Sequence, residues 1–211
     1  MFNIHFPSLS ELAIMLPAIV VGLTVHEFAH GWAAYMLGDN TARQAGRLTL
    51  NPLAHIDPVG LLLLFIAGFG WAKPVPVNPF HMYGDRRRGM LLVALAGPAT
   101  NMLVALLSAV LLGLGLWRWP YIQAIMIQMI NINVVLAIFN LLPVPPLDGS
   151  KILAGLLPGR QEWLWQLEQY GTIVLLLLLF TGILGKVMQI IILPVLRLMI
   201  NFAQFIASFI A

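Results

Sequence analysis

The sequence GLTVHEFAHGWAAYML, residues 22–37, places two histidines and a glutamate inside an otherwise apolar segment. That segment begins near residue 11 and is long enough to form a helix that crosses a membrane. Ionisable side chains in such a helix are costly unless a partner or a cation satisfies them. His26, Glu27 and His30 therefore predict a functional site within a membrane helix.

The composition supports a membrane protein. Of the 211 residues, 60% are hydrophobic and only 9% are charged, whereas a soluble domain is about half apolar and a quarter charged. The net charge of +3 comes from scattered basic residues apart from DRRRG at 85–89, so membrane topology explains it better than a nucleic-acid partner. The chain has no cysteine, which excludes disulfides, thiol catalysis and cysteine metal ligands.

Further apolar segments predict the rest of the bundle. Residues 89–116, 121–142, 163–184 and 187–210 read as spans, and the last two are separated at residues 185–186. Residues 58–72 are too short for a straight span and predict a re-entrant or partly buried element. We expect an all-α membrane protein, a polytopic bundle of five to six spans that forms a single domain over residues 1–211.

Two segments outside the spans favour extended backbone. RLTL at 47–50 could pair as a short strand, and AKPVPVNPF at 72–80 predicts an edge strand or an extended segment, not a helix, because its prolines alternate with other residues. Three prolines at 143, 145 and 146 predict that the span at 121–142 is broken near Pro143.

The distribution of basic residues predicts the topology. If the first span runs inward and 58–72 re-enters, eight Lys and Arg residues collect on one side and two on the other. By the positive-inside rule the N-terminus then lies outside and the chain ends inside. The eight are Arg43, Arg47, Lys73, Arg86, Arg87, Arg88, Lys151 and Arg160, and the two are Arg118 and Lys186.

The spacing of the three ionisable residues is typical of a zinc hydrolase. His26 and His30 are four residues apart, so both imidazoles lie on one face of a helix and can bind one metal ion. Glu27 can reach a coordinated water without ligating the metal, and the three residues fit the H-E-x-x-H pattern. Chance would produce only about 0.002 such matches in a chain of this composition.

A catalytic zinc needs a third protein ligand and one open position. Asp148 is the best candidate because it follows the proline-broken span, where a buried carboxylate requires a cation. Its alternative role is to cap the helix that follows. The other candidates lie in polar loops or near the N-terminus: His5, Asp39, His55, Asp57, His81 and Asp85.

The motif GPATN, residues 97–101, lies within the span at 89–116. Gly97 and Pro98 predict close helix approach and a kink, and Asn101 is a polar group inside the bundle. Asn101 has two possible roles: an interhelical hydrogen bond, or an amide that holds a substrate carbonyl in the manner of an oxyanion hole.

Together HEFAH (26–30), GPATN (97–101) and NLLPVPPLDG (140–149) resemble the site-2 protease family of intramembrane zinc metalloproteases. The last motif fits the family pattern N-x-x-P-x-P-x-L-D-G, and GRLTLNPLAHIDPVG and GWAKPVPVNP resemble the compact prokaryotic branch. Unlike larger members, the chain shows no PDZ or CBS domain.

The resemblance implies a mechanism and a substrate class. One zinc ion per chain is held by His26, His30 and Asp148, Glu27 is the general base, and Asn101 holds the substrate carbonyl. The substrate is a transmembrane helix of another protein, and in the compact branch a small membrane-embedded β-element after the zinc-binding helix receives it as an added strand. Cleavage takes place near the cytoplasmic face of a prokaryotic inner membrane, and no nucleic acid is involved.

Two other functions are compatible with intramembrane histidines and carboxylates. A membrane metal-ion transporter would string its ligands along a route, whereas these converge on one site. A non-catalytic scaffold that binds transmembrane helices would want a fourth protein ligand for a closed zinc site. Neither alternative gives Glu27 a chemical role.

Overall fold

A computed structural model describes residues 8–67, 70–115, 119–158 and 162–210, without the side chains of 64–67 and 162–168. Four of its helices are long and apolar enough to cross a membrane, which makes the chain a multi-pass membrane protein. They are α1 (Leu9–Met36), α4 (Arg86–Gly113), α5 (Pro120–Asn140) and α8 (Ile183–Ala207).

Helix α1 carries HEFAH and begins at a capping box. The Ser8 hydroxyl accepts the backbone N–H of Glu11, and the Glu11 carboxylate accepts the backbone N–H of Ser8. These two bonds satisfy donors that the first turn of a helix leaves free. Ser8 is therefore the N-cap of α1, and the first predicted span is confirmed with small shifts at its ends.

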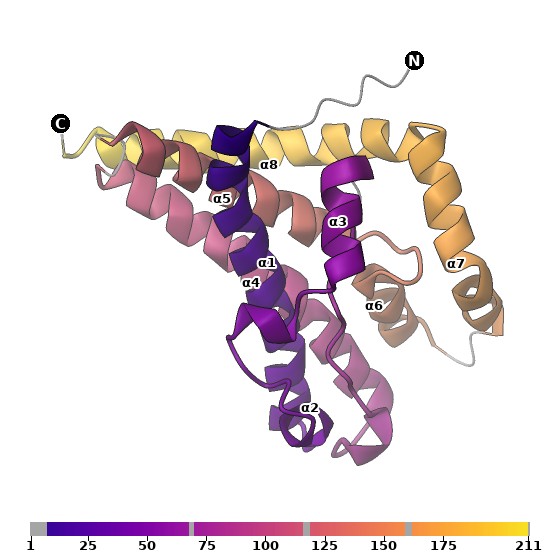
Figure 1. Ribbon diagram of the computed structural model, residues 1–211. Coiled ribbons are helices and arrows are strands. Elements are labelled where there is room, and N and C mark those ends of the chain that lie inside the picture. The colour runs from indigo at the N-terminus through magenta and orange to yellow at the C-terminus, as the bar shows by residue number, and fades with distance from the viewer. Residues whose placement is uncertain (1–7, 68–69, 116–118, 159–161, 211) are drawn as a thin grey trace.

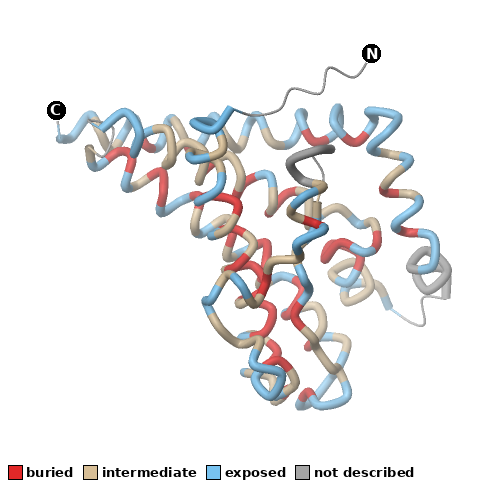
Figure 2. The backbone as a smooth tube through the Cα atoms, viewed as in Figure 1, coloured by how far each residue is buried: buried red, intermediate tan, exposed pale blue. Residues whose placement is uncertain are grey.

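Helix α4 is the centre of the bundle, because it packs against α1, α5, α6 (Asp148–Leu156) and α8. Figure 1 shows α1 and α4 crossing near the middle of the molecule, with α8 lying across the top of the view. Buried residues gather on α1, α4 and α5 where these helices meet, whereas α7 (Glu162–Phe180) and α8 are largely exposed (Figure 2). The largest apolar cluster joins α4, α5, α7 and α8, and includes Ala105, Ile130, Val134 and Leu175.

The number of candidate spans among the described residues is four, below the five to six expected. Within α7, the residues whose side chains are described form a shorter apolar helix, Gln169–Phe180. The boundary expected at 185–186 lies instead at residues 181–182, and Gly185 is inside α8.

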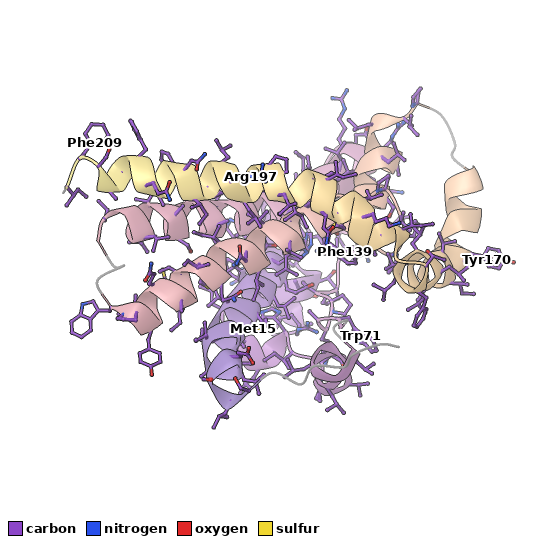
Figure 3. All side chains as sticks on the ribbon, turned by 90° about the horizontal axis from the view of Figure 1, so that it is seen from above. Met15, Trp71, Phe139, Tyr170, Arg197 and Phe209 are labelled. Atoms are coloured by element: carbon purple, nitrogen blue, oxygen red, sulfur yellow. The ribbon has the colours of Figure 1, made fainter. Side chains whose placement is uncertain are left out.

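Seen from above, α8 carries Arg197 near its middle, and Phe209 and Tyr170 lie at opposite sides of the molecule (Figure 3).

The segment after α1 contains short elements and bends. They are α2 (Thr41–Gln44), η1 (Pro52–Ala54), α3 (Pro58–Ala67) and η2 (Pro79–His81). Helix α3 has only ten residues, too few to span a membrane. Of the predicted re-entrant segment 58–72, residues 68 and 69 lie outside the described residues.

The prediction of a β-element is wrong: the described residues contain no pair of strands. Residues 48–50 form a bend, and residues 73–78 are extended but take no part in a β-ladder. A single antiparallel bridge joins Ile56 to Ala72. Pro74 and Pro76 have no N–H to donate to a ladder, and the Arg47 guanidinium donates to the carbonyls of Lys73 and Pro74 at 2.7 and 3.3 Å, where a neighbouring strand would pair.

The proline break is confirmed. Helix α5 ends at Asn140, and a turn through the prolines leads directly into α6, which begins at Asp148. A side chain at Gly149 would collide with the carbonyl oxygens of Leu141 and Leu142. Glycine at 149 therefore lets the chain fold tightly back on itself and brings Asp148 into the bundle.

Candidate metal centre

Three buried side chains from two distant parts of the chain converge on one point. His26 Nε2 and His30 Nε2 are 3.0 Å apart, and Asp148 Oδ2 lies 3.2 Å from the first and 3.1 Å from the second. The two histidines come from α1 and the aspartate from the first turn of α6. Among the described residues this is the group of His, Asp and Glu side chains that could hold a metal ion.

Hydrogen bonds on the far side of each imidazole fix its protonation. His30 Nδ1 lies 2.7 Å from the carbonyl oxygen of Val93, which can only accept, so Nδ1 carries the hydrogen. His26 Nδ1 lies 2.6 Å from Asn101 Oδ1 and donates to it for the same reason. In the neutral imidazoles both Nε2 atoms are therefore acceptors that point into the site.

This donor set fits a zinc ion. Two imidazole lone pairs and a carboxylate oxygen face one another with no hydrogen to share, an arrangement that a cation satisfies. Zinc ligands at about 2.0–2.1 Å in a tetrahedral site are about 3.3–3.4 Å apart, close to the observed 3.0–3.2 Å. Two histidines and one carboxylate also match the ligands of a catalytic zinc with one open position.

Helix α4 approaches the two imidazoles closely at Gly97. A Cβ built at Gly97 would lie 2.5 Å from His30 Nε2 and 2.6 Å from His26 Cε1. Only glycine leaves room for both rings at this crossing. The close approach expected from GPATN is confirmed, and its effect is to hold the backbone of α4 against the two imidazoles.

The carboxylate of Glu27 is buried beside the histidines and is held by the backbone of the extended segment 73–78. Its Oε2 accepts the N–H of Val75 at 2.7 Å. The structure gives no other hydrogen bond to Glu27 within the described residues. One carboxylate oxygen is thus anchored, and the other is left to accept a proton.

Asp148 does not cap α6, because Leu147 occupies the N-cap position and no side chain caps this end. The two carboxylate oxygens instead have different neighbours. Oδ2 faces the histidines, and Oδ1 lies 3.8 Å from Lys151 Nζ. Its place in the first turn also puts a negative charge at the positive end of the helix dipole.

The other candidate ligands do not reach this centre. Asp57 accepts backbone N–H groups at the start of α3, Asp85 accepts the N–H of Arg87 at the start of α4, and the His55 imidazole bonds to the carbonyl of Thr49. Asp39 and His81 lie 3.4 Å apart in a separate loop cluster. His5 lies outside the described residues.

Both polar atoms of the Asn101 side chain are already hydrogen-bonded within the protein. Its Oδ1 accepts from His26, and its Nδ2 donates to the Gly22 carbonyl and to Asn133 Oδ1, each at 2.9 Å. The carbonyl-holding role stays a prediction, and these bonds favour the interhelical role. Sequence reasoning missed Asn133; the available signal was an amide inside an apolar span.

Comparison with known proteins agrees with the site. The family model described as Peptidase family M50 matches residues 115–182, a stretch that contains Asp148 but not HEFAH. The “Putative zinc metalloprotease YwhC” of Bacillus subtilis is 42% identical over 187 residues, 84% of each chain. The similarly named Rip2 of Mycolicibacterium smegmatis is 33% identical, covering 82% of this chain and 69% of the relative.

The similarity extends to the archaea. The protein named MJ0611 of Methanocaldococcus jannaschii is 31% identical over 159 residues, covering 72% of this chain and 76% of the relative. No solved structure matches the chain significantly. The high coverage of the relatives, together with the motifs and their convergence in space, shows that the chain belongs to peptidase family M50, the site-2 protease family.

Proposed function

We propose that this M50 metalloprotease hydrolyses a peptide bond within or beside a transmembrane segment of another membrane protein. The observation that carries the proposal is the placement of the candidate metal centre. His26, His30 and Asp148 are buried among helices that are apolar enough to cross a membrane. A hydrolytic site in that place meets membrane segments before it meets soluble peptides.

His26, His30 and Asp148 hold one zinc ion in this proposal, and Glu27 is the general base. When bound, zinc polarises a carbonyl and lowers the pKa of water towards 7. Glu27 takes the proton from the attacking water at its free oxygen while Val75 holds the other one. The same carboxyl group then delivers that proton to the leaving amine, so that the peptide bond breaks without a covalent intermediate.

The extended segment 73–78 supports a way to hold an unwound substrate. A membrane helix satisfies its own backbone groups, so it must be unwound before cleavage. In the described structure no hydrogen bond reaches the carbonyls of Val75 and Pro76 or the N–H of Val77. These groups belong to Val75, whose own N–H binds Glu27, and to the two residues that follow it. They offer an edge for β-augmentation by a substrate strand.

The orientation and location form part of the same proposal. The excess of Lys and Arg flanking HEFAH and the proline-broken segment favours a cytoplasmic position for these loops. We therefore place the chain in a prokaryotic inner membrane with the site nearer the cytoplasmic face. The lipid bilayer and a transmembrane protein substrate are its partners, and all functional parts belong to one domain.

A direct test uses the purified chain in proteoliposomes with a panel of single-span membrane proteins. Wild type is expected to cut at least one of them near its membrane boundary, as read by mass spectrometry. Glu27→Gln is expected to retain zinc and lose cleavage by several orders of magnitude. If the variant cleaves as wild type does, the assignment of the base is wrong.

The two alternative functions give different results in the same vesicles. A metal-ion transporter would carry zinc across the bilayer, with or without Glu27, and would leave every panel protein intact. A scaffold would bind single-span proteins without cutting them. Either outcome would overturn the protease proposal.

A further inference from the structure

A chain of buried polar groups runs from α5 through α4 to the metal centre on α1. Asn133 Nδ2 donates to the Met129 carbonyl at 2.8 Å, and Asn133 Oδ1 accepts from Asn101 Nδ2 at 2.9 Å. Asn101 Oδ1 in turn accepts from His26 Nδ1 at 2.6 Å. Both asparagine residues are fully buried, so water cannot replace any of these bonds.

The direction of every bond in this chain is determined by backbone carbonyls, which only accept. The Met129 carbonyl requires the NH₂ group of Asn133 to point towards it, which turns Asn133 Oδ1 towards Asn101. That oxygen and the Gly22 carbonyl both demand a donor, so Asn101 presents its NH₂ group to them and its oxygen to His26.

The final link determines the tautomer of a metal ligand. His26 must donate from Nδ1, because a bare nitrogen facing Asn101 Oδ1 at 2.6 Å would place two acceptors in contact. The hydrogen on Nδ1 leaves the lone pair of Nε2 for the metal. An Asn101 amide turned by 180° would favour the opposite tautomer and remove that lone pair from the site.

We infer that Asn133 is a positioning residue of the metal centre: acting through Asn101, it holds His26 in the tautomer and ring orientation that bind zinc. This inference rests on the proposed function. It gives the two histidines different supports, because His30 is oriented directly by the Val93 backbone. Side-chain substitution can therefore disturb His26 while leaving the orientation of His30 intact.

The packing around Asn133 agrees with this role. A Cβ built at Gly22 would lie 3.1 Å from Asn133 Oδ1 and 2.8 Å from Leu136 Cδ1. Helix α5 thus meets α1 one turn before His26, at the residue whose carbonyl also binds Asn101. The amide pair closes a junction of α1, α4 and α5 directly behind the metal ligand.

The test is a double-mutant cycle read by zinc affinity in lipid nanodiscs, with a chelator of known affinity as competitor. Asn133→Leu removes the hydrogen bonds at similar size, and Asn101→Leu removes the contact to His26 itself. Substitution of groups that orient metal ligands typically weakens metal binding about 10- to 100-fold. We expect about tenfold for Asn133→Leu and at least as much for Asn101→Leu.

The double variant separates positioning from general stability. If Asn133 acts through Asn101, then Asn133→Leu adds no further loss in the Asn101→Leu background. A merely structural role would add its loss in full. The visible spectrum of the Co²⁺-substituted protein provides a second readout, and it is expected to change in Asn133→Leu because the geometry of one ligand changes.

Ser108→Ala is the matched control. Ser108 is buried on α4, seven residues beyond Asn101 and on the same face, and its hydroxyl donates only to the Val104 carbonyl of its own helix. Its loss should leave zinc affinity and the Co²⁺ spectrum unchanged. Asn133→Ala repeats the measurement with a smaller side chain if the leucine variant does not fold.

The outcomes distinguish this inference from the function on which it rests. Wild type that binds zinc, with Asn133→Leu binding equally tightly, overturns the role of Asn133 alone. Full additivity in the double variant does the same. Wild type that binds no zinc overturns both.

Discussion

At the scale of single residues, the absence of a side chain at Gly97 lets the backbone of α4 pack directly against the imidazoles of His26 and His30. Because an added Cβ would overlap the rings of His26 and His30, Gly97→Ala must displace at least one imidazole. Overpacking a tight site costs about 1–3 kcal/mol, so zinc binding should weaken about tenfold or more. The measurement is zinc affinity by chelator competition.

Gly185→Ala provides the control for Gly97→Ala. Gly185 lies inside α8 and has nothing within 4 Å of an added Cβ. Alanine there should leave zinc affinity unchanged and raise the free energy of unfolding by about 0.5–1 kcal/mol. Wild-type zinc affinity in Gly97→Ala would show that the rings do not depend on this close approach.

The residues of the candidate metal centre could be predicted from the sequence one by one. The groups that hydrogen-bond to these residues and orient them could not. The spacing of His26 and His30 fixes their common helix face, and a costly buried carboxylate at Asp148 needs a cation, so their convergence follows from local arguments. The roles of Asn133 and of the Val75 N–H depend on how α5 and segment 73–78 sit against α1 and α4. The rotation of α5 about its axis and the position of a backbone N–H group cannot be read from local sequence patterns.

At the scale of elements, the extended segment 73–78 contributes a backbone donor to Glu27, the proposed general base. Val75→Pro removes the N–H that Glu27 accepts while retaining extended backbone. A lost hydrogen bond to a charged group costs about 1.5–3 kcal/mol. We therefore expect kcat to fall about 10- to 100-fold with unchanged zinc content, measured on a cleaved panel protein.

Val75→Ala keeps the N–H and removes only side-chain packing, so it should retain most of the wild-type kcat. A rise in KM with constant kcat in Val75→Pro would show that the segment serves substrate binding and not the orientation of Glu27. An equal loss in both variants would assign the effect to packing of the Val75 side chain.

A second element-scale feature joins the end of α1 to segment 73–78. The buried Asp39 carboxylate accepts the backbone N–H of Asn78 at 2.6 Å and both the N–H and the hydroxyl of Thr41. Burial alone would raise the pKa of Asp39, but these hydrogen bonds outweigh it and hold the pKa below its ordinary value.

The sign of the pH dependence follows from this lowered pKa. A depressed carboxyl pKa stabilises the fold fully at neutral pH, and the stabilisation is lost as the pH falls below about 4. Asp39→Asn should lower the melting temperature at pH 7 and show a weaker further fall on acidification than wild type. Parallel acid limbs in the two proteins would contradict the assignment to Asp39.

The sequence predicted the apolar helices well and the connecting loop poorly. The approximate extents of α1, α4 and α5 and the break before Asp148 follow from local composition and from prolines, which act within one element, whereas the boundary between α7 and α8 lies four residues before its expected place. The strand expected at residues 47–50 failed because strand pairing depends on a neighbour. Here the Arg47 side chain takes the carbonyls of Lys73 and Pro74 that a partner strand would use.

At the scale of the whole molecule, the candidate metal centre joins α1 and α6, two helices that each pack against α4. The histidines lie on α1, and Asp148, more than a hundred residues later, lies on α6. Helix α6 packs against α4 (Figure 1). A bound zinc ion therefore adds a direct tie between α1 and α6, and at a hundredfold excess over Kd it should raise the free energy of unfolding by about 2.7 kcal/mol.

This tie can be measured as a distance, because the chain has no cysteine of its own and two engineered ones are unique labelling sites. Spin labels at Leu16→Cys on α1 and Leu156→Cys on α6 occupy exposed positions away from the ligands. Adding zinc to the metal-free protein should narrow the distance distribution between them, since the ion fixes α6 relative to α1. The same labels in a His30→Ala background should not respond. An unchanged distribution in a protein that has taken up one zinc ion would mean that α4 alone already fixes Asp148, and that the metal acts only in the chemistry.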